Sequence, residues 1–312
     1  MLSILLVGAT YTWFSLSATP RVSDMQMYVN SPTGLELAAK FDAPDEEWTQ
    51  LISFADLVTD DTPLKPATWS DAQKTFLTSS YGLDGRLTDK WQVLGMKKSA
   101  DAPMPTDSKG YYVVGTFFAR THETCTVSLA EAAEINDGKN GYGTYVIGTP
   151  VWDADKLIHV DGGSGAETAI RLGFMITPIN SETGEDAEGS TFYIYEPNCD
   201  VHREGDDQTY KPTPSIDGTE TLSKNLILQT VSGWSEADPV QRLVTIKDLG
   251  KFTTSTELFR LYGGNMLRID LYVWLEGQDI DCTNTIKEAR IMANIQFNAK
   301  YDNQSGLVDI PQ

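Results

Sequence analysis

The sequence has little cysteine and little histidine, and both shortages limit the chemistry it can support. Its 312 residues include three cysteines and three histidines. Three cysteines are too few for a disulfide scaffold. Histidine is the most common catalytic base, and the G-x-S-x-G pattern around a nucleophilic serine is also absent. We therefore expect that the protein is not an enzyme.

Basic residues are also scarce relative to acidic ones. The chain has 24 Lys and Arg against 44 Asp and Glu, a formal net charge of -20. Such a charge repels the phosphates of nucleic acids and of anionic lipid surfaces. We expect no nucleic-acid partner, and membrane contact only through an apolar N-terminal segment if it is retained. The surplus carboxylates could hold hard cations such as calcium.

Long apolar runs are missing except at the start, where residues 1–16 read MLSILLVGATYTWFSL and Arg21 is the first ionisable side chain. The run is shorter than the roughly 20 apolar residues that span a bilayer. Residues 1–9 resemble a signal peptide, because an apolar block is followed by the small residues Gly8 and Ala9. We therefore expect an extracellular or cell-surface protein.

Two features leave this interpretation of the N-terminus open. The basic residues that normally precede the apolar block are absent. Tyr11 and Trp13 also suit a β-strand, so the alternative is a buried first strand. The two interpretations agree if cleavage follows Ala9 and the strand begins the mature chain.

Strand patterns dominate the rest of the sequence. In residues 267–276 (LRIDLYVWLE) apolar and other side chains alternate, which predicts a strand with one face in the core. Further strands are expected at 25–29, 35–37, 111–120, 142–147, 169–177, 191–195, 225–231, 242–246 and 291–301. No helices of 10–15 residues separate them regularly, so we expect an all-β antiparallel sandwich, similar to a jelly roll.

The expected domain organisation is a single elaborated sandwich over residues 10–312. Residues 41–110 are rich in Pro, Asp, Thr and Ser and are expected to form a loop-rich excursion. Short helices are expected at 70–78, with Ser70 as N-cap, and at 128–134 and 283–290. Two sandwich domains are the alternative, although no Pro/Gly/Ser-rich linker divides the chain.

A candidate calcium loop follows the clearest strand. Asp279, Asp281 and Asn284 place oxygen ligands on one loop, a partial version of the calcium-loop pattern. The glycine and the distal glutamate of the complete loop are missing. The alternative is that Asp281 or Thr283 caps the short helix expected at 283–290.

Zinc has a weaker candidate site. His122 and Cys125, together with Cys199 and His202, would supply two nitrogen and two sulfur ligands. The alternatives are a Cys125–Cys199 disulfide or unrelated buried cysteines. The pairing among these two cysteines and Cys282 stays open.

A stretch of about thirty residues near the N-terminus, from Val7 to Leu37, is similar to a known family. The sequence TYTWFS after a small residue, followed by Gly34-Leu35-Glu36-Leu37, resembles the TasA and camelysin group, secreted β-sandwich surface proteins of Gram-positive bacteria. The resemblance implies export, a jelly-roll-like fold and assembly into surface fibres, as in a biofilm matrix. In such fibres an N-terminal strand completes the sheet of a neighbouring subunit. Here its residues would be Thr10, Tyr11, Thr12, Trp13, Phe14 and Ser15, within 10–17.

The sequence thus favours a secreted structural protein that self-associates by strand exchange. The alternative is an extracellular module that binds a glycan or a surface partner, since exposed aromatic rings beside carboxylates suit sugars. A hydrolase ranks last, because 44 acidic residues give no basis for choosing a catalytic pair.

Overall fold

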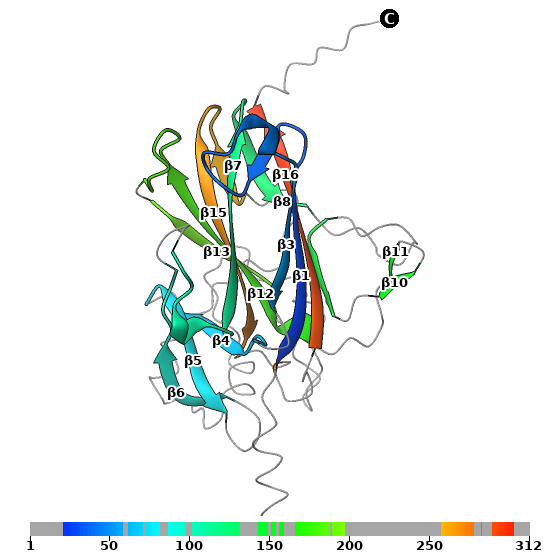
Figure 1. The fold of residues 1–312 in the computed structure, drawn as a ribbon, viewed down its shortest axis with the longest axis vertical. Coiled ribbons are helices and arrows are strands. Elements are labelled where there is room, and N and C mark those ends of the chain that lie inside the picture. Colours follow the sequence, from blue (N-terminus) through cyan, green and yellow to red (C-terminus); the bar gives the residue numbers. More distant parts are fainter. Residues whose placement is uncertain are drawn as a thin grey trace, which may run out of the picture.

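Strand β15 (Met266–Glu276) matches the alternating segment and lies inside an eight-stranded sheet. The structure, a computed structural model, describes residues 21–58, 62–70, 73–81, 87–97, 102–130, 143–148, 151–153, 156–158, 166–187, 189–196, 257–277, 282 and 289–302. In these residues the fold is mainly β and contains two multi-stranded sheets (Figure 1). The all-β sandwich class is confirmed.

The eight-stranded sheet is here called sheet II. Its strands are β13 (Thr191–Tyr195), β12 (Ile170–Ile179), β15, β7 (Tyr112–Thr121), β2 (Leu35–Ala38), β4 (Pro66–Ser70), β5 (Thr75–Tyr81) and β6 (Leu87–Val93). β15 pairs with β12 along one edge and with β7 along most of the other. Beyond the end of β7, β15 pairs with β4, which leads to β5 and β6.

The six-stranded sheet, sheet I, is built around the last strand. Its strands are β14 (Phe259–Leu261), β8 (Cys125–Leu129), β9 (Tyr145–Gly148), β16 (Ala289–Tyr301), β1 (Val22–Asn30) and β3 (Leu51–Val58). β16 pairs with β1 along one edge, and with β9 and then β8 along the other. The β1–β16 and β4–β15 pairs are parallel, so both sheets are mixed and not purely antiparallel as expected.

The main core lies between the two sheets, which form two layers in Figure 1. Alternate residues of β15, from Leu267 to Leu275, face buried side chains of β1 and β16. The sheet I side includes Met25, Met27, Val29, Ile291, Ile295 and Phe297. Each fully buried side chain of this kind contributes about 1.5–3 kcal/mol. This packing explains why the period-two pattern of β15 was readable from the sequence.

The opposite face of β15 is also buried, which the pattern did not predict. Every residue of β15 is buried. Tyr272 and Trp274 pack beneath Trp69 and Phe76, which belong to β4 and β5. Figure 1 shows β4, β5 and β6 at the lower left, where this end of sheet II lies apart from its other strands.

Residues 41–110 hold more regular structure than the expected loop-rich excursion. Their described parts contain β3, β4, β5 and β6 and the single-turn 3-10 helices η1 (Asp45–Glu47) and η2 (Thr106–Ser108). The predicted helix at 70–78 is wrong. The Ser70 Oγ does accept a hydrogen bond from the Gln73 N–H at 3.2 Å, but this bond closes the turn between β4 and β5.

The structure has strands in the described parts of the two other predicted helices. Ser128 lies in β8 and pairs with Asn298, so the expected helix at 128–134 does not begin there. Residues 289 and 290 belong to β16. The remaining described elements are the one-turn helix α2 (Ala166–Ala169) and the hairpin of β10 (Val151–Asp153) and β11 (Lys156–Ile158). The strands expected at 225–231 and 242–246 lie outside the described residues.

No helix within the described ranges combines the length and apolarity that a membrane crossing requires.

Candidate functional site

The outward face of sheet II carries ordered rows of side chains across β7, β15 and β12. Thr116 on β7 is opposite Asp270 on β15, and Phe118 is opposite Arg268. Two residues after Asp270 on β15, Tyr272 lies on the same face, with β7 on one side and β12 on the other. Trp274 follows two residues later. The polar side chains of this face therefore lie in the upper rows, beside Phe118, and the lower rows are aromatic.

The lower rows are covered by the β4–β6 layer. Tyr112, Tyr272 and Trp274 are buried beneath it. Ring centroids of Phe76 and Tyr112 are 4.6 Å apart, and those of Phe76 and Trp274 are 5.1 Å apart. Burial in this apolar layer raises the pKa of the Tyr272 hydroxyl, and the Asp270 carboxylate adds to the effect.

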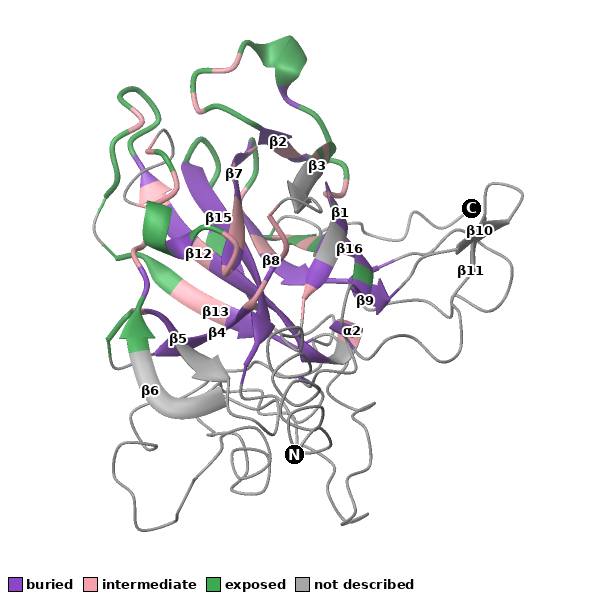
Figure 2. Ribbon diagram, turned by 60° about the horizontal axis from the view of Figure 1, so that its bottom comes forward, coloured by how far each residue is buried: buried purple, intermediate pink, exposed green. Residues whose placement is uncertain are grey.

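Above that cover the face opens into a cavity of about 730 Å³, here called the outer groove. Its floor includes Thr116, Phe118 and Arg268, and Lys97 also lines it. One wall is residues 39–42, which follow β2, and the other is residues 183–186, in the turn between β12 and β13. Figure 2 shows exposed residues at the loops around this end of the sheet and buried residues on its central strands.

Arg268 is the charged centre of the groove floor. Its Nε donates to Asp270 Oδ2 at 3.1 Å, and its Nη1 is paired with Asp186 Oδ1 in the wall. Arg268 and Asp270 are nearly buried, whereas 43% of the Asp186 side chain is exposed. A planar guanidinium fixed by two carboxylates is held in one orientation.

Lys97 connects to the same network through a hydroxyl. Its ammonium donates to Thr116 Oγ1 at 3.2 Å, and that hydroxyl donates to Asp270 Oδ1 at 2.6 Å. Asp270 thus accepts from both Thr116 and Arg268. The result is a preorganised set of donors and acceptors on a rigid strand, of the kind that orients a ligand.

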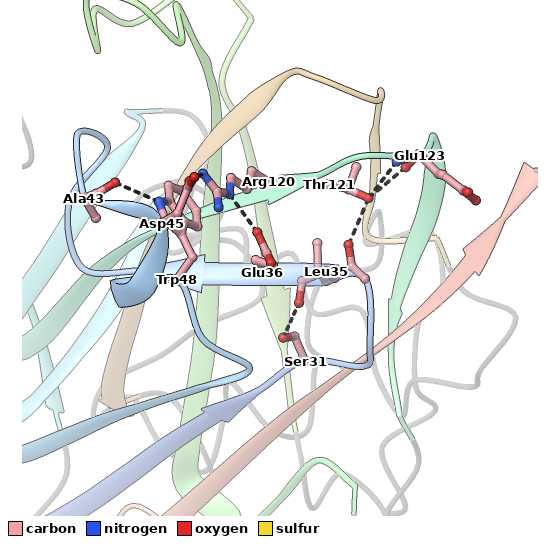
Figure 3. A network of polar contacts seen from close by, with 10 residues as sticks. Ser31, Leu35, Glu36, Ala43, Asp45, Trp48, Arg120, Thr121 and Glu123 are labelled. Atoms are coloured by element: carbon pink, nitrogen blue, oxygen red, sulfur yellow. Dashed lines mark hydrogen bonds and ion pairs between the residues drawn. The ribbon is translucent and has the colours of Figure 1, made fainter.

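The wall formed by the β2–β3 connection is anchored by Arg120. Its guanidinium donates to Glu36 and to Asp45, both at 2.8 Å, and stacks over the ring of Trp48 at 4.2 Å (Figure 3). The Trp48 indole N–H donates to the Ala43 carbonyl at 3.0 Å. Burial opposes the Arg120 charge, but the two carboxylates outweigh it and raise the pKa of Arg120.

A second charged cluster lies under the cover and is closed to solvent. Arg171 forms an ion pair with Glu196 at 2.7 Å, and the Trp274 indole N–H donates to Glu276 at 3.0 Å. All four side chains are buried. The Arg171–Glu196 pair links β12 to the end of β13, and the Trp274–Glu276 hydrogen bond lies within β15.

The calcium and assembly residues predicted from the sequence lie outside the described part of the structure. Asp279, Asp281 and Asn284, the calcium candidates, lie outside it. So do the assembly residues, from Thr10 to Ser15. Within the described ranges, no three His, Cys, Asp or Glu side chains are placed to share a metal ion.

The zinc candidates are described only in part. Cys199 and His202 lie outside the described residues. His122 is exposed, whereas Cys125 lies in the main core with a thiol whose pKa is raised by burial. Because Cys199 lies outside the described residues, the alternative Cys125–Cys199 disulfide stays a prediction.

No local pattern in the sequence predicts the outer groove. Arg268 and Asp270 occur there only as polar positions of an alternating strand. Their spacing of two residues does place both on one face. Asp186 is 82 residues away from Arg268 in the sequence, and no local pattern connects them.

Comparisons with known proteins place the chain in no family. No family model matches it, and neither a curated protein nor a solved structure is significantly similar.

Proposed function

We propose that the protein is an extracellular or cell-surface β-sandwich module that binds a glycan in the outer groove. The observation that carries this proposal is the composition of the groove. Phe41 and Phe118 supply aromatic surface, and Thr116, Asp186 and Arg268 supply hydrogen-bonding groups. Sites for small molecules combine these two kinds of surface, with few and well-placed polar groups.

The charge balance of the groove favours a neutral ligand. The basic groups along its lining are Lys40, Lys97 and Arg268, and the acidic groups are Asp42, Glu185 and Asp186. Three basic and three acidic residues thus line the groove, although acidic residues outnumber basic ones 44 to 24 in the whole chain. A neutral sugar offers many hydroxyl groups that pair with donors and acceptors alike, and its apolar faces pack on aromatic rings.

A glycan array tests this function. The wild-type protein is expected to give saturable binding to at least one neutral glycan. Phe41→Ala should weaken that binding by about tenfold, since it removes a half-buried aromatic surface from the groove. Tyr262→Ala is the matched control, because Tyr262 is 55% exposed and is not among the residues that line the groove. An array without saturable binding, or equal loss in both variants, contradicts the proposal.

A second candidate function is the fibre subunit that the N-terminal resemblance implies. It is supported by β3, which in the described residues pairs with β1 and no other strand. β3 reads LISFADLV, with one charged residue, and Leu51 at its start is 52% exposed. An apolar edge strand of this kind accepts a strand from another chain. The donor would be residues 10–17 of a neighbouring subunit.

Negative-stain electron microscopy separates the two candidates. The chain beginning at Thr10 should form filaments if strands are exchanged, and deletion of residues 10–17 should leave a folded monomer. Filaments that persist after the deletion contradict strand exchange. A monomeric protein that binds glycans supports the binding module alone.

A further inference from the structure

A second and smaller cavity lies beside the outer groove, and we call it the lysine pocket. Its volume is about 380 Å³. Its apolar wall includes Leu64, Met104, Val113 and Val114, with Leu64 fully buried. Lys97 lines both cavities, whereas the second ammonium of the pocket, that of Lys109, lines only this one.

The lining charge of this pocket is opposite to that of the chain. Lys97 and Lys109 are the charged residues among the ten that line it, and none of the ten is acidic. The chain as a whole carries a net charge of -20. In the described part of the structure, Lys109 has no ion-pair partner and Lys97 is hydrogen-bonded to the neutral Thr116 hydroxyl.

Asp107 lies two residues before Lys109 in the sequence, and its carboxylate takes part in other hydrogen bonds. Asp107 accepts hydrogen bonds from the Gly95 N–H at 3.2 Å and from the Ser108 hydroxyl at 3.3 Å. Ser108 in turn bonds the Gly95 carbonyl, as does the Tyr112 hydroxyl at 2.7 Å. These bonds tie η2 to the segment after β6. In the described part of the structure, neither lysine ammonium forms an ion pair with a carboxylate.

We propose that the lysine pocket binds a small carboxylate with an apolar body. The ammonium of Lys109 would take the carboxylate, with Lys97 as the second cation, and the alkyl or aryl part would contact Met104, Val113 and Val114. A carboxylate bound by ammonium groups forms charge-assisted hydrogen bonds, which are stronger than neutral ones. The volume is near the lower end of the range of about 300–1,000 Å³ found for small-molecule sites, which suits a short acid better than a polymer. This site is separate from the glycan proposal.

Isothermal titration with octanoate tests the proposal, with 1-octanol as the uncharged probe of nearly equal length. Octanoate is expected to bind one site on the full chain, about tenfold more tightly than 1-octanol, because only the acid can pair with the lysines. Lys109→Gln should remove most of that difference while leaving 1-octanol binding unchanged. Lys109 is exposed, so the variant should fold normally.

The matched control is Lys65→Gln. Lys65 lies next to the pocket, where its N–H donates to the Gly110 carbonyl at 2.6 Å, but its ammonium stacks over Tyr111 and it does not line the cavity. The proposal holds if Lys109→Gln weakens octanoate binding by about fivefold or more and Lys65→Gln does not. It is overturned if octanoate does not bind, if both probes bind equally, or if the two variants behave alike. Glycan binding by Lys109→Gln should equal that of the wild type, so this proposal and the glycan proposal can fail separately.

Discussion

Gly184 and Phe41 bring the two walls of the outer groove into contact. Gly184 has a φ of 71°, and a Cβ added there would lie 2.7 Å from carbons of the Phe41 ring. The Phe41 ring in turn packs edge-on against Phe118 at 6.2 Å between centroids. The β12–β13 turn thus fixes the position of residues 39–42, the opposite wall. The shape of the groove is set by this packing.

Gly184→Ala should disturb the groove as well as the turn. We expect a loss of stability of about 2–4 kcal/mol, because a left-handed backbone conformation and a crowded ring both oppose the added methyl group. Glycan affinity should fall with it. The control is Gly264→Ala, which has a similar φ of 81° and no atom within 4 Å of the added Cβ. It should lose only about 1 kcal/mol, measured by urea unfolding, and keep its glycan affinity. Equal losses in the two variants would show that Phe41 does not constrain the turn.

Asp270→Asn should be costly because it leaves Arg268 with one carboxylate in a nearly buried site. We expect a loss of about 2–4 kcal/mol in urea unfolding, somewhat below the usual cost of breaking a buried pair because Asp186 remains. Asp186→Asn is the comparison, since that carboxylate is 43% exposed and should contribute about 0–1 kcal/mol. A larger loss for Asp186→Asn would reverse the assignment of Asp270 as the main partner of Arg268.

Arg120→Lys should loosen the β2–β3 wall. Lysine lacks the planar fork that reaches Glu36 and Asp45 together and stacks less well on Trp48, so we expect a loss of about 1–2 kcal/mol. The control is Arg260→Lys. Arg260 also has a carboxylate partner, Asp302, and a ring at 5.6 Å, but its side chain is 41% exposed. That variant should change the unfolding free energy by less than about 0.5 kcal/mol.

Stability should fall steeply in alkali. Burial raises the pKa of Tyr145 to about 12, from about 10 in the unfolded chain, and raises those of Tyr112 and Tyr272 as well. Between these values the unfolded chain releases protons that the folded chain keeps, so stability is complete below pH 10 and is lost as pH rises toward 12.

The Tyr145 contribution can be isolated by mutation. Tyr145→Phe should make the decline between pH 10 and pH 12 shallower by about 1.4 kcal/mol per pH unit in urea unfolding. Identical slopes for wild type and Tyr145→Phe would contradict the role of burial.

Local patterns predicted the strands of the central sandwich well. Residues 191–195 were predicted as a strand and form β13, and the pattern at 267–276 differs from β15 by one residue. These strands have a strongly apolar face, which a period-two pattern reports directly. The predicted N-cap at Ser70 identified a real hydrogen bond, but the same bond closes a hairpin turn as easily as it begins a helix.

The layer that shapes the site was harder to predict. β6 reads LTDKWQV and β5 reads TFLTSSY, and such polar strands resemble loops when only local sequence is considered. They form because Trp69 and Phe76 pack against Tyr272 and Trp274, which lie some 200 residues later in the chain. The groove exists only where that cover ends, so its position depends on long-range contacts that composition and periodicity do not encode.

Amide hydrogen exchange with and without the glycan that binds best on the array tests the central claim most directly. Our account predicts that the glycan slows exchange in residues 39–42 and 183–186, the two walls of the outer groove, and leaves β3 and η2 unchanged. Protection located elsewhere, or no protection at a saturating glycan concentration, would contradict the assignment of the outer groove as the binding site.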